Sequence, residues 1–204
     1  RIGVGLIGGS FVLDLKRLGL VDTVTGIDLD RDNLDRALER RVIDRAYTQI
    51  DALSMHEADL AVIATPVSTF PDICRTVRPY LNAHTVVTDV GSTKQSAVQA
   101  FRSVLPEHLS RCIAAHPIAG SDRSGALSAQ FGLFQDRKLV ITPHGDEDEQ
   151  AVSLVENLWL AVGAQTFRMS AEEHDAVFAA VSHMPHLAAF AYVHQIADHP
   201  DGRH

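Results

Sequence analysis

Cysteine is scarce in this chain, since Cys74 and Cys112 are the only two among 204 residues and they form no CxxC pair. This argues against a disulfide framework and suits a reducing cytoplasm, with both thiols buried. Positive charge is also in deficit, because 18 Lys and Arg face 26 Asp and Glu. The absence of a basic cluster argues against nucleic-acid binding. No apolar run approaches the length of a membrane span and there is no signal peptide, so we expect a soluble cytoplasmic protein.

Short apolar runs alternate with helical patterns through most of the chain. The run ADLAVIATP (58–66) is almost continuously apolar, which is typical of a strand buried on both faces of a parallel sheet. The alternation predicts an α/β fold with a Rossmann-like, mostly parallel sheet that helices cover on both faces. Strands are predicted at 23–28, 58–66, 85–90, 111–117, 138–143 and 164–169, and helices at 10–20, 31–41, 67–81, 93–104 and 149–163.

A different pattern begins at Ser170, where a long helical periodicity is rich in alanine and apolar on more than one side. Ser170 and Glu173 match a capping box at its start, and Pro185 predicts a kink within it. We therefore place a domain boundary near residue 169. The prediction is a dinucleotide-binding domain at 1–169 and, at 170–204, the first helix of a helical substrate and dimerisation domain.

The opening RIGVGLIGGS contains the spacing Gly-x-Gly-x-x-Gly. In a dinucleotide-binding fold these glycines permit a tight strand-to-helix turn, close approach to the pyrophosphate and close helix–strand packing. Asp28 follows at the end of a predicted strand, where a carboxylate binds the ribose hydroxyls and favours NAD over NADP. The alternative is a plain strand–helix turn, with Asp28 capping the turn after its strand. The residues predicted to bind NAD here are Gly3, Gly5, Leu6, Ile7, Gly8 and Asp28.

Both ends of the sequence are short for this fold. Only Arg1 and Ile2 precede the first glycine, which is too few for the strand that a dinucleotide-binding domain places there. The other end stops in the turn-like stretch HPDGRH, directly after the long helical pattern. We therefore expect the chain to be a fragment of a longer protein.

Three further stretches are more specific: DVGSTK (89–94), AAHPIAGSDRSG (114–125) and SHMPH (182–186). Together with GVGLIGGS (3–10), they resemble the prephenate and arogenate dehydrogenase family over essentially the whole chain. The resemblance implies NAD-dependent oxidation of a cyclohexadienyl alcohol whose ring becomes aromatic as carbon dioxide leaves. Prephenate would yield 4-hydroxyphenylpyruvate, in tyrosine biosynthesis. Arogenate, or both substrates, is the alternative, because no residue of this sequence decides between them.

His116 stands where a predicted strand ends, as expected for catalytic groups of open α/β sheets. Hydride removal from a carbon that bears a hydroxyl requires the oxygen to lose its proton, and a neutral imidazole can accept it. The resemblance implies this role for His116. It also implies that Ser92 hydrogen-bonds the substrate hydroxyl and the histidine, although Ser92 and Gln95 match a capping box for the next helix. We expect a structural or electrostatic role for Lys94.

The resemblance also points to residues around the substrate. Asp122 stands where the family commonly has glutamate, at the mouth of the active site, and Ser121 beside it is associated with tyrosine feedback. His186 is expected in the substrate pocket, with His183 in a supporting or structural role. These two histidines share one helix face with Asp175, so a metal site on these three residues is the alternative. Hydride transfer requires no metal, and we expect none.

Thr65 and Pro66 end the apolar run at 58–66 and belong to ATPVST (64–69), where a loop is expected to line the nicotinamide half of the cofactor, although Pro66 also suits a plain strand stop. The resemblance implies a homodimer through the C-terminal helical region, and an arginine for the substrate carboxylate beyond this chain. A non-catalytic NAD-sensing module is a further alternative on the same fold. Such a module needs the glycines and Asp28 but has no use for a base at His116.

Overall fold

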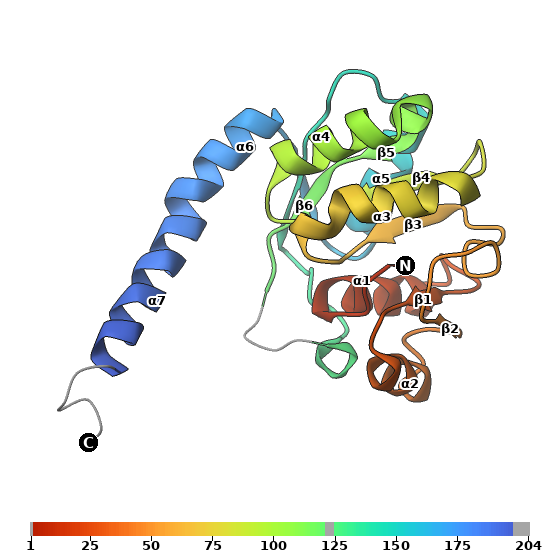
Figure 1. The fold of residues 1–204 in the computed structure, drawn as a ribbon, viewed down its shortest axis with the longest axis horizontal. Helices are drawn as coiled ribbons and strands as arrows, with labels where there is room; N and C mark the ends of the chain where they lie inside the picture. Colours follow the sequence, from red (N-terminus) through yellow and green to blue (C-terminus); the bar gives the residue numbers. More distant parts are fainter. Residues whose placement is uncertain (1, 121–124, 198–204) are drawn as a thin grey trace.

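The computed structural model describes residues 2–120 and 125–197 (Figure 1). Its strands are β1 (Thr25–Ile27), β2 (Arg45–Tyr47), β3 (Leu60–Ile63), β4 (Val86–Asp89), β5 (Cys112–Ile113), β6 (Ala115–Pro117), β7 (Lys138–Ile141) and β8 (Gln165–Arg168). Its α-helices are α1 (Leu6–Arg17), α2 (Arg31–Glu39), α3 (Phe70–Val77), α4 (Lys94–Val104), α5 (Glu149–Ala161), α6 (Ala171–Phe178) and α7 (Met184–Ala197).

A parallel sheet forms the centre of the molecule. β1 pairs with β2, β3 pairs with β4 and β4 with β5, all in parallel, and Ile2 alone bridges Ile27 and Ile63. The order is therefore β2–β1–Ile2–β3–β4–β5, and the chain winds outward in both directions from Ile2. In such sheets ligands bind at the carboxyl ends of the strands, at this reversal point. The predicted Rossmann-like, mostly parallel sheet is confirmed.

The predicted strand at 111–117 is divided in the structure. β5 extends the parallel sheet, whereas β6 pairs antiparallel with β7 and belongs to a second sheet with β8. The break falls at Ala114, whose carbonyl accepts a hydrogen bond from the N–H of Thr142 at 3.0 Å. The chain thus passes from one sheet to the other just before His116.

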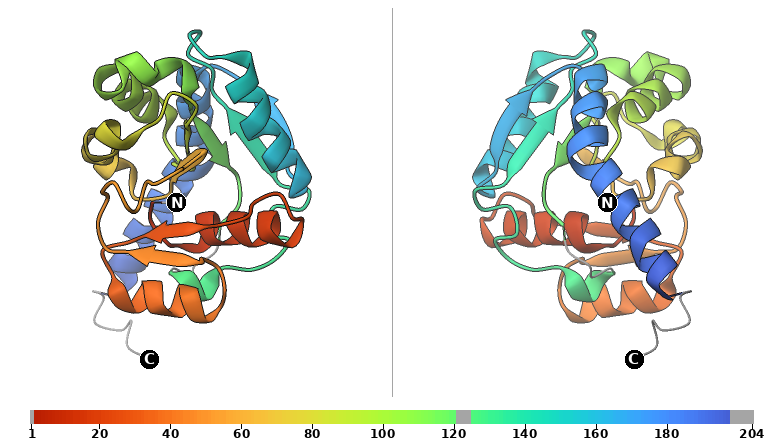
Figure 2. Two further views of the ribbon diagram at one scale, coloured as in Figure 1. Left: turned by 90° about the vertical axis from the view of Figure 1, so that its right-hand side faces the viewer. Right: turned by 90° about the vertical axis from the view of Figure 1, so that its left-hand side faces the viewer.

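Helices cover both faces of the parallel sheet, as predicted (Figure 2). Alternate residues of β3 explain this arrangement, because Ile63 packs with α3 and α4 while Val62 packs with α1 and α5. On the second face, the rings of Phe11 and Trp159 stack with centroids 4.0 Å apart. Each such fully buried side chain stabilises the fold by about 1.5–3 kcal/mol.

Both cysteines lie in the core on the α3 and α4 face of the sheet. Cys74 and Cys112 are free and fully buried, which confirms the prediction of buried thiols. Burial raises the pKa of both thiols, and that of Cys74 reaches about 12. Neither thiol is therefore ionised at neutral pH.

The C-terminal helical region leaves the sheet domain as an arm, with α6 against α4 and α7 standing apart (Figure 1). The predicted capping box is confirmed, since Ser170 and Glu173 each accept a hydrogen bond from the other's backbone N–H. A π-helical segment, Ala179–His183, interrupts the regular helix just before Pro185. Large apolar side chains are exposed along the arm, namely Val177, Val181, Met184, Leu187, Phe190, Tyr192 and Val193. No helix in the described ranges is both long enough and apolar enough to cross a membrane.

Candidate active site

The glycine loop lies at the reversal point of the sheet. Gly3 has φ +86°, and a Cβ at this position would come within 2.7 Å of the carbonyl oxygen of Ala64 after β3. Its N–H also donates to the carbonyl of Ile27 at the end of β1, at 2.8 Å. The loop is therefore held between two strands at a distance that only glycine permits.

Helix α1 starts directly after this loop, with Gly5 as its N-cap. Gly5 has no side chain to accept hydrogen bonds from the first turn, and no acidic residue stands in that turn. A Cβ at Gly5 would meet no atom of residues 2–120 and 125–197 within 4 Å. The first turn contains the other predicted residues Leu6, Ile7 and Gly8, of which Leu6 and Gly8 are buried. The N-terminal amides of α1 are thus arranged as in helices that bind phosphate.

Asp28 follows β1 and braces the glycine loop. Its Oδ2 accepts from the N–H of Val4 at 2.7 Å and from Asn33 Nδ2 at 3.2 Å, and its Oδ1 accepts from the N–H of Asp30 at 3.0 Å. Both interpretations of this residue thus have support, because it caps the turn after its strand and also lies beside the glycine loop. Asn33 was not predicted, yet its amide also donates to the carbonyl of Val4 at 2.6 Å.

Thr65 and Pro66 lie at the same edge, just after β3. The Cγ2 of Thr65 lies within 2.9 Å of the position that a Cβ on Gly3 would take. The hydroxyl groups of Thr65 and Thr69 are 2.9 Å apart, and Thr69 also donates to the carbonyl of Pro66 at 2.7 Å. The structure therefore brings together the predicted cofactor residues of the glycine loop and of the β3 end.

A buried ion pair underlies the other part of the site. Lys94, the first residue of α4, is fully buried and pairs with Asp89 at the end of β4. Asp89 Oδ1 accepts from the N–H of Ala115 at 3.1 Å, while Lys94 Nζ donates to the Ala115 carbonyl at 2.7 Å. Burial raises the pKa of Asp89 and lowers that of Lys94, and the charge of each partner opposes this effect. The pair fixes both backbone polar groups of the residue before His116.

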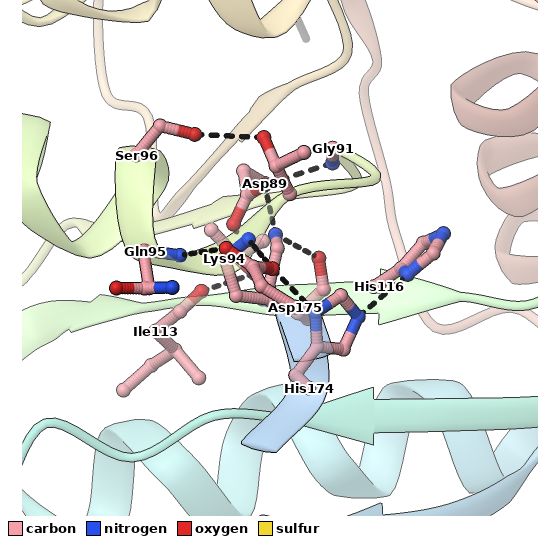
Figure 3. A network of polar contacts seen from close by, with 12 residues as sticks. Asp89, Gly91, Lys94, Gln95, Ser96, Ile113, His116, His174 and Asp175 are labelled. Carbon is pink, nitrogen blue, oxygen red and sulfur yellow. Dashed lines mark hydrogen bonds and ion pairs between the residues drawn. The ribbon is translucent and has the colours of Figure 1, made fainter. Parts of the chain in front are cut away.

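The half-buried His116 takes part in a chain of side chains that reaches into the helical arm (Figure 3). Its Nδ1 lies 2.8 Å from Nε2 of His174, and Nδ1 of His174 lies 2.8 Å from Oδ1 of Asp175. His174 is fully buried, and its ring stacks on Phe178 with centroids 4.5 Å apart. His174 was not predicted. It lies three residues after Ala171 on the inner face of α6, and the sequence does not mark that face as buried.

The pKa shifts in this chain have clear causes. Burial lowers the pKa of His174, although the hydrogen bond and the charge of Asp175 oppose it. Burial by itself would raise the pKa of Asp175, but the N–H of Lys94, the ring of His174 and the N–H of Gln95 together lower it. Asp175 is therefore ionised and His174 neutral at neutral pH.

The capping box predicted for Ser92 and Gln95 is wrong. Helix α4 begins at Lys94 after Thr93, and no side chain of its own segment caps it. Asp175 caps it instead, accepting from the N–H of Lys94 at 2.7 Å and of Gln95 at 3.0 Å. Ser92 is exposed in the turn before α4, and within residues 2–120 and 125–197 its hydroxyl makes no hydrogen bond. The bond to His116 implied by the resemblance is thus not formed there.

Several predicted substrate residues lie outside what the structure describes. Ser121 and Asp122 belong to the undescribed segment 121–124, and the side chains of His183 and His186 are not described either. Of the three residues in the alternative metal site, Asp175 instead caps α4 and contacts His174. Within the described part of the chain, no group of three or more His, Cys, Asp or Glu is arranged to hold a metal ion.

Comparison with known proteins now identifies the family. Residues 11–168 match the nucleotide-binding domain of prephenate dehydrogenase, and residues 170–203 match its dimerization domain. The chain belongs to the prephenate dehydrogenase family. The two matches together extend across both parts of the molecule, the sheet domain and the helical arm.

Individual members of the prephenate dehydrogenase family are similar over nearly the whole chain. Prephenate dehydrogenase of Bacillus subtilis is 38% identical over 195 residues, which are 95% of this chain and 52% of the relative. The structure of the Aquifex aeolicus enzyme in complex with hydroxyphenyl propionate and NAD+ has a TM-score of 0.88 and 33% identity, covering 96% of this chain and 68% of that one. Synechocystis arogenate dehydrogenase has a TM-score of 0.82 and 26% identity, covering 98% and 69%. The chain thus spans about half the length of the Bacillus relative.

Proposed function

We propose that the protein containing this chain is an NAD-dependent prephenate dehydrogenase of tyrosine biosynthesis, which converts prephenate to 4-hydroxyphenylpyruvate and carbon dioxide. The observation that carries the proposal is His116. The backbone of the preceding residue, Ala115, is held by a buried ion pair. The ring of His116 contacts the buried His174, which in turn contacts the ionised Asp175. A domain that only senses a dinucleotide has no need for a histidine held in this way.

The glycine loop fits a dinucleotide. Gly3 permits the close turn, the uncapped first turn of α1 offers N–H groups to a pyrophosphate, and Asp28 offers a carboxylate for ribose hydroxyls. Gly5, Leu6, Ile7 and Gly8 complete this loop, with Thr65 and Pro66 at the nicotinamide side. When bound, NAD supplies the hydride acceptor.

The residues of the chain account for the proton in this reaction. His116 accepts the proton of the substrate hydroxyl as the carbon beneath it loses hydride and becomes a carbonyl carbon. The bond to the ring carboxylate then breaks, its electrons enter the ring, and carbon dioxide leaves as a phenolate forms. The phenolate oxygen takes the proton back from His116 and becomes the phenol. We assign Ser92 to the same hydroxyl. Contacts with the remainder of the substrate are assigned to Ser121, Asp122, His183 and His186.

The proposed organisation follows the sequence analysis, with a dinucleotide-binding domain at 1–169 and the start of a helical domain at 170–204. Residues 170–203 match a dimerization domain, and the arm exposes large apolar side chains. We therefore propose a homodimer that forms through this region. Two free, buried thiols suit the cytoplasm as its location.

Arogenate is the second candidate substrate, because the fold matches Synechocystis arogenate dehydrogenase closely. Arogenate carries an amino group where prephenate carries a keto group, on the side chain away from the reacting hydroxyl. The chemistry assigned to His116 is the same for both substrates.

The test is NADH formation by the whole protein, with prephenate and arogenate offered separately under identical conditions. We expect rapid turnover of at least one substrate, and a loss of about 10²–10⁴-fold in kcat for His116→Asn. NAD binding by that variant, followed by calorimetry, should match that of the parent protein. Tight NAD binding without turnover of either substrate would contradict the proposal and leave a dinucleotide-sensing module.

A further inference from the structure

We call the group formed by His116, His174, Asp175 and the ion pair of Lys94 with Asp89 the His116 cluster. The contacts of His174 determine where the protons lie in this cluster. Asp175 accepts hydrogen bonds from the N–H groups of Lys94 and Gln95, so its carboxylate is held in its ionised, acceptor-only form. Nδ1 of His174, 2.8 Å from Oδ1 of Asp175, must then be the protonated nitrogen of that ring. Because a neutral imidazole has one donor and one acceptor, Nε2 of His174 is an acceptor.

The same reasoning extends to His116. Nε2 of His174 can accept only if Nδ1 of His116, at 2.8 Å, carries a proton. The lone pair of the neutral His116 ring then lies on Nε2, which is the nitrogen that must take a proton from substrate. We propose that His174, anchored by Asp175, is a positioning residue that sets the tautomer and the ring orientation of His116; this rests on the proposed function of His116 as the base.

Packing fixes His174 in the orientation that this assignment requires. Its ring is fully buried and stacks on Phe178 at an interplanar angle of 29°, and Phe178 also meets the ring of His116 edge-on, with centroids 5.1 Å apart. Among residues 2–120 and 125–197, the charged groups that act on the pKa of His174 are Asp175, Lys94 and Asp89. Lys94 and Asp89 pair with each other, whereas Asp175 contacts the ring of His174 directly.

This arrangement links the two parts of the family fold. His116 lies in the part that matches the nucleotide-binding domain, whereas His174 and Asp175 lie in the part that matches the dimerization domain. The same carboxylate also caps α4, so the tautomer of His116 depends on the docking of α6 against α4. The helical region would thus act on the proton-accepting atom itself as well as on assembly.

The deciding measurement is the tautomer of His116, read from two-bond 15N–1H correlations in the whole protein labelled with 15N-histidine. We expect the Nδ1–H form of His116 in the parent protein. His174→Phe keeps a ring against Phe178 but cannot accept a hydrogen bond, so the Nε2–H form of His116 should then become populated and kcat should fall by about 10- to 100-fold. His174→Gln has an amide oxygen that can accept from His116. This variant should restore part of the Nδ1–H population of His116 and part of kcat.

Ser170→Ala is the matched control, because it removes one exposed hydrogen bond of α6 and leaves the side chains of His116, His174 and Asp175 in place. We expect it to leave the tautomer and kcat unchanged. If His116 is in the Nε2–H form in the parent protein, or if His174→Phe changes neither tautomer nor kcat, the inference is overturned. The tautomer readout needs no turnover, so a parent protein that oxidises neither substrate contradicts the proposed function alone.

Discussion

The glycine loop and the His116 cluster lie at the same end of the sheet but are built in opposite ways. The loop depends on the absence of side chains, since Gly3 approaches Ala64 too closely for a Cβ and Gly5, the N-cap of α1, has no side chain to cap the first turn. The cluster depends on buried charged and titratable side chains, with Asp89, Lys94 and His174 all fully buried. The function of the loop therefore depends on its backbone. That of the cluster depends on polar contacts, and because these are buried, their loss would reduce the stability of the fold.

The contrast also concerns distance along the chain. The loop is formed by neighbouring residues, whereas Asp175 is 81 residues from the N–H of Lys94 that it caps. The loop also contacts the ends of β1 and β3, at Ile27 and Ala64, but its glycines are close neighbours in the sequence. The cluster instead requires that three separate elements, β4, α4 and α6, are docked together.

The largest expected effect on stability comes from breaking the ion pair of the cluster. Lys94→Met leaves Asp89 buried without its partner, and we expect a loss of about 3–5 kcal/mol in the free energy of unfolding by urea. The matched control is Lys16→Met, which removes the partly exposed pair with Asp44 and should cost at most about 1 kcal/mol. Equal losses of unfolding free energy in the two variants would show that burial does not increase the contribution of the Lys94–Asp89 pair.

A smaller effect is expected in the loop, where two glycines can be compared. Gly3→Ala forces a side chain into φ +86° against Ala64 and should cost about 1–3 kcal/mol while abolishing NAD binding. Gly5→Ala has room for its Cβ and should fold within about 0.5 kcal/mol of the parent, yet weaken NAD binding. Urea unfolding and NAD titration separate the two outcomes. A Gly5→Ala variant with unchanged NAD affinity would remove Gly5 from the cofactor site.

The smallest expected effect is a dependence of the free energy of unfolding on pH, which distinguishes the His116 cluster from the glycine loop. Burial lowers the pKa of His174, so the unfolded chain takes up a proton below about pH 6.5 that the folded chain does not bind. Stability should therefore fall as pH falls through this window, by at most about 1.4 kcal/mol per pH unit. The lowered pKa of Asp175 acts in the same direction, below about pH 3.9.

Urea unfolding at a series of pH values checks this prediction. His174→Phe should flatten the slope between about pH 6.5 and 5, whereas Gly3→Ala should shift the whole curve and keep its slope. The control for loss of a histidine is His56→Phe, at a side chain that is 60% exposed. A His174→Phe slope equal to that of the parent would show that this ring does not titrate on unfolding.

Most of the fold could be predicted from the sequence, because buried parallel strands produce apolar runs such as that of β3. β2 could not, since its three residues are exposed or half-buried at a sheet edge and show no alternation. The division of residues 111–117 into β5 and β6 could not be predicted from the sequence either. It depends on the side chains of Asp89 and Lys94, which reach the backbone of Ala115 from another strand and helix.

The candidate site could likewise be predicted only in part from the sequence. The position of the glycine loop followed from local spacing, and His116 stands out at the end of a predicted strand. Its contact with His174, 58 residues away, has no local signature. The wrong capping box at Ser92 shows the same limit, because a local pattern was available while the actual cap, Asp175, came from a distant helix.

The two buried cysteines have a practical consequence. With a pKa of about 12, the thiol of Cys74 is unreactive toward alkylating reagents while the core around it is closed, and Cys112 is shielded alike. Modification must therefore wait for the core to open. The labelling rates of Cys74 in α3 and of Cys112 in β5 would thus report how often the core on the α3 and α4 face of the sheet opens around each of them.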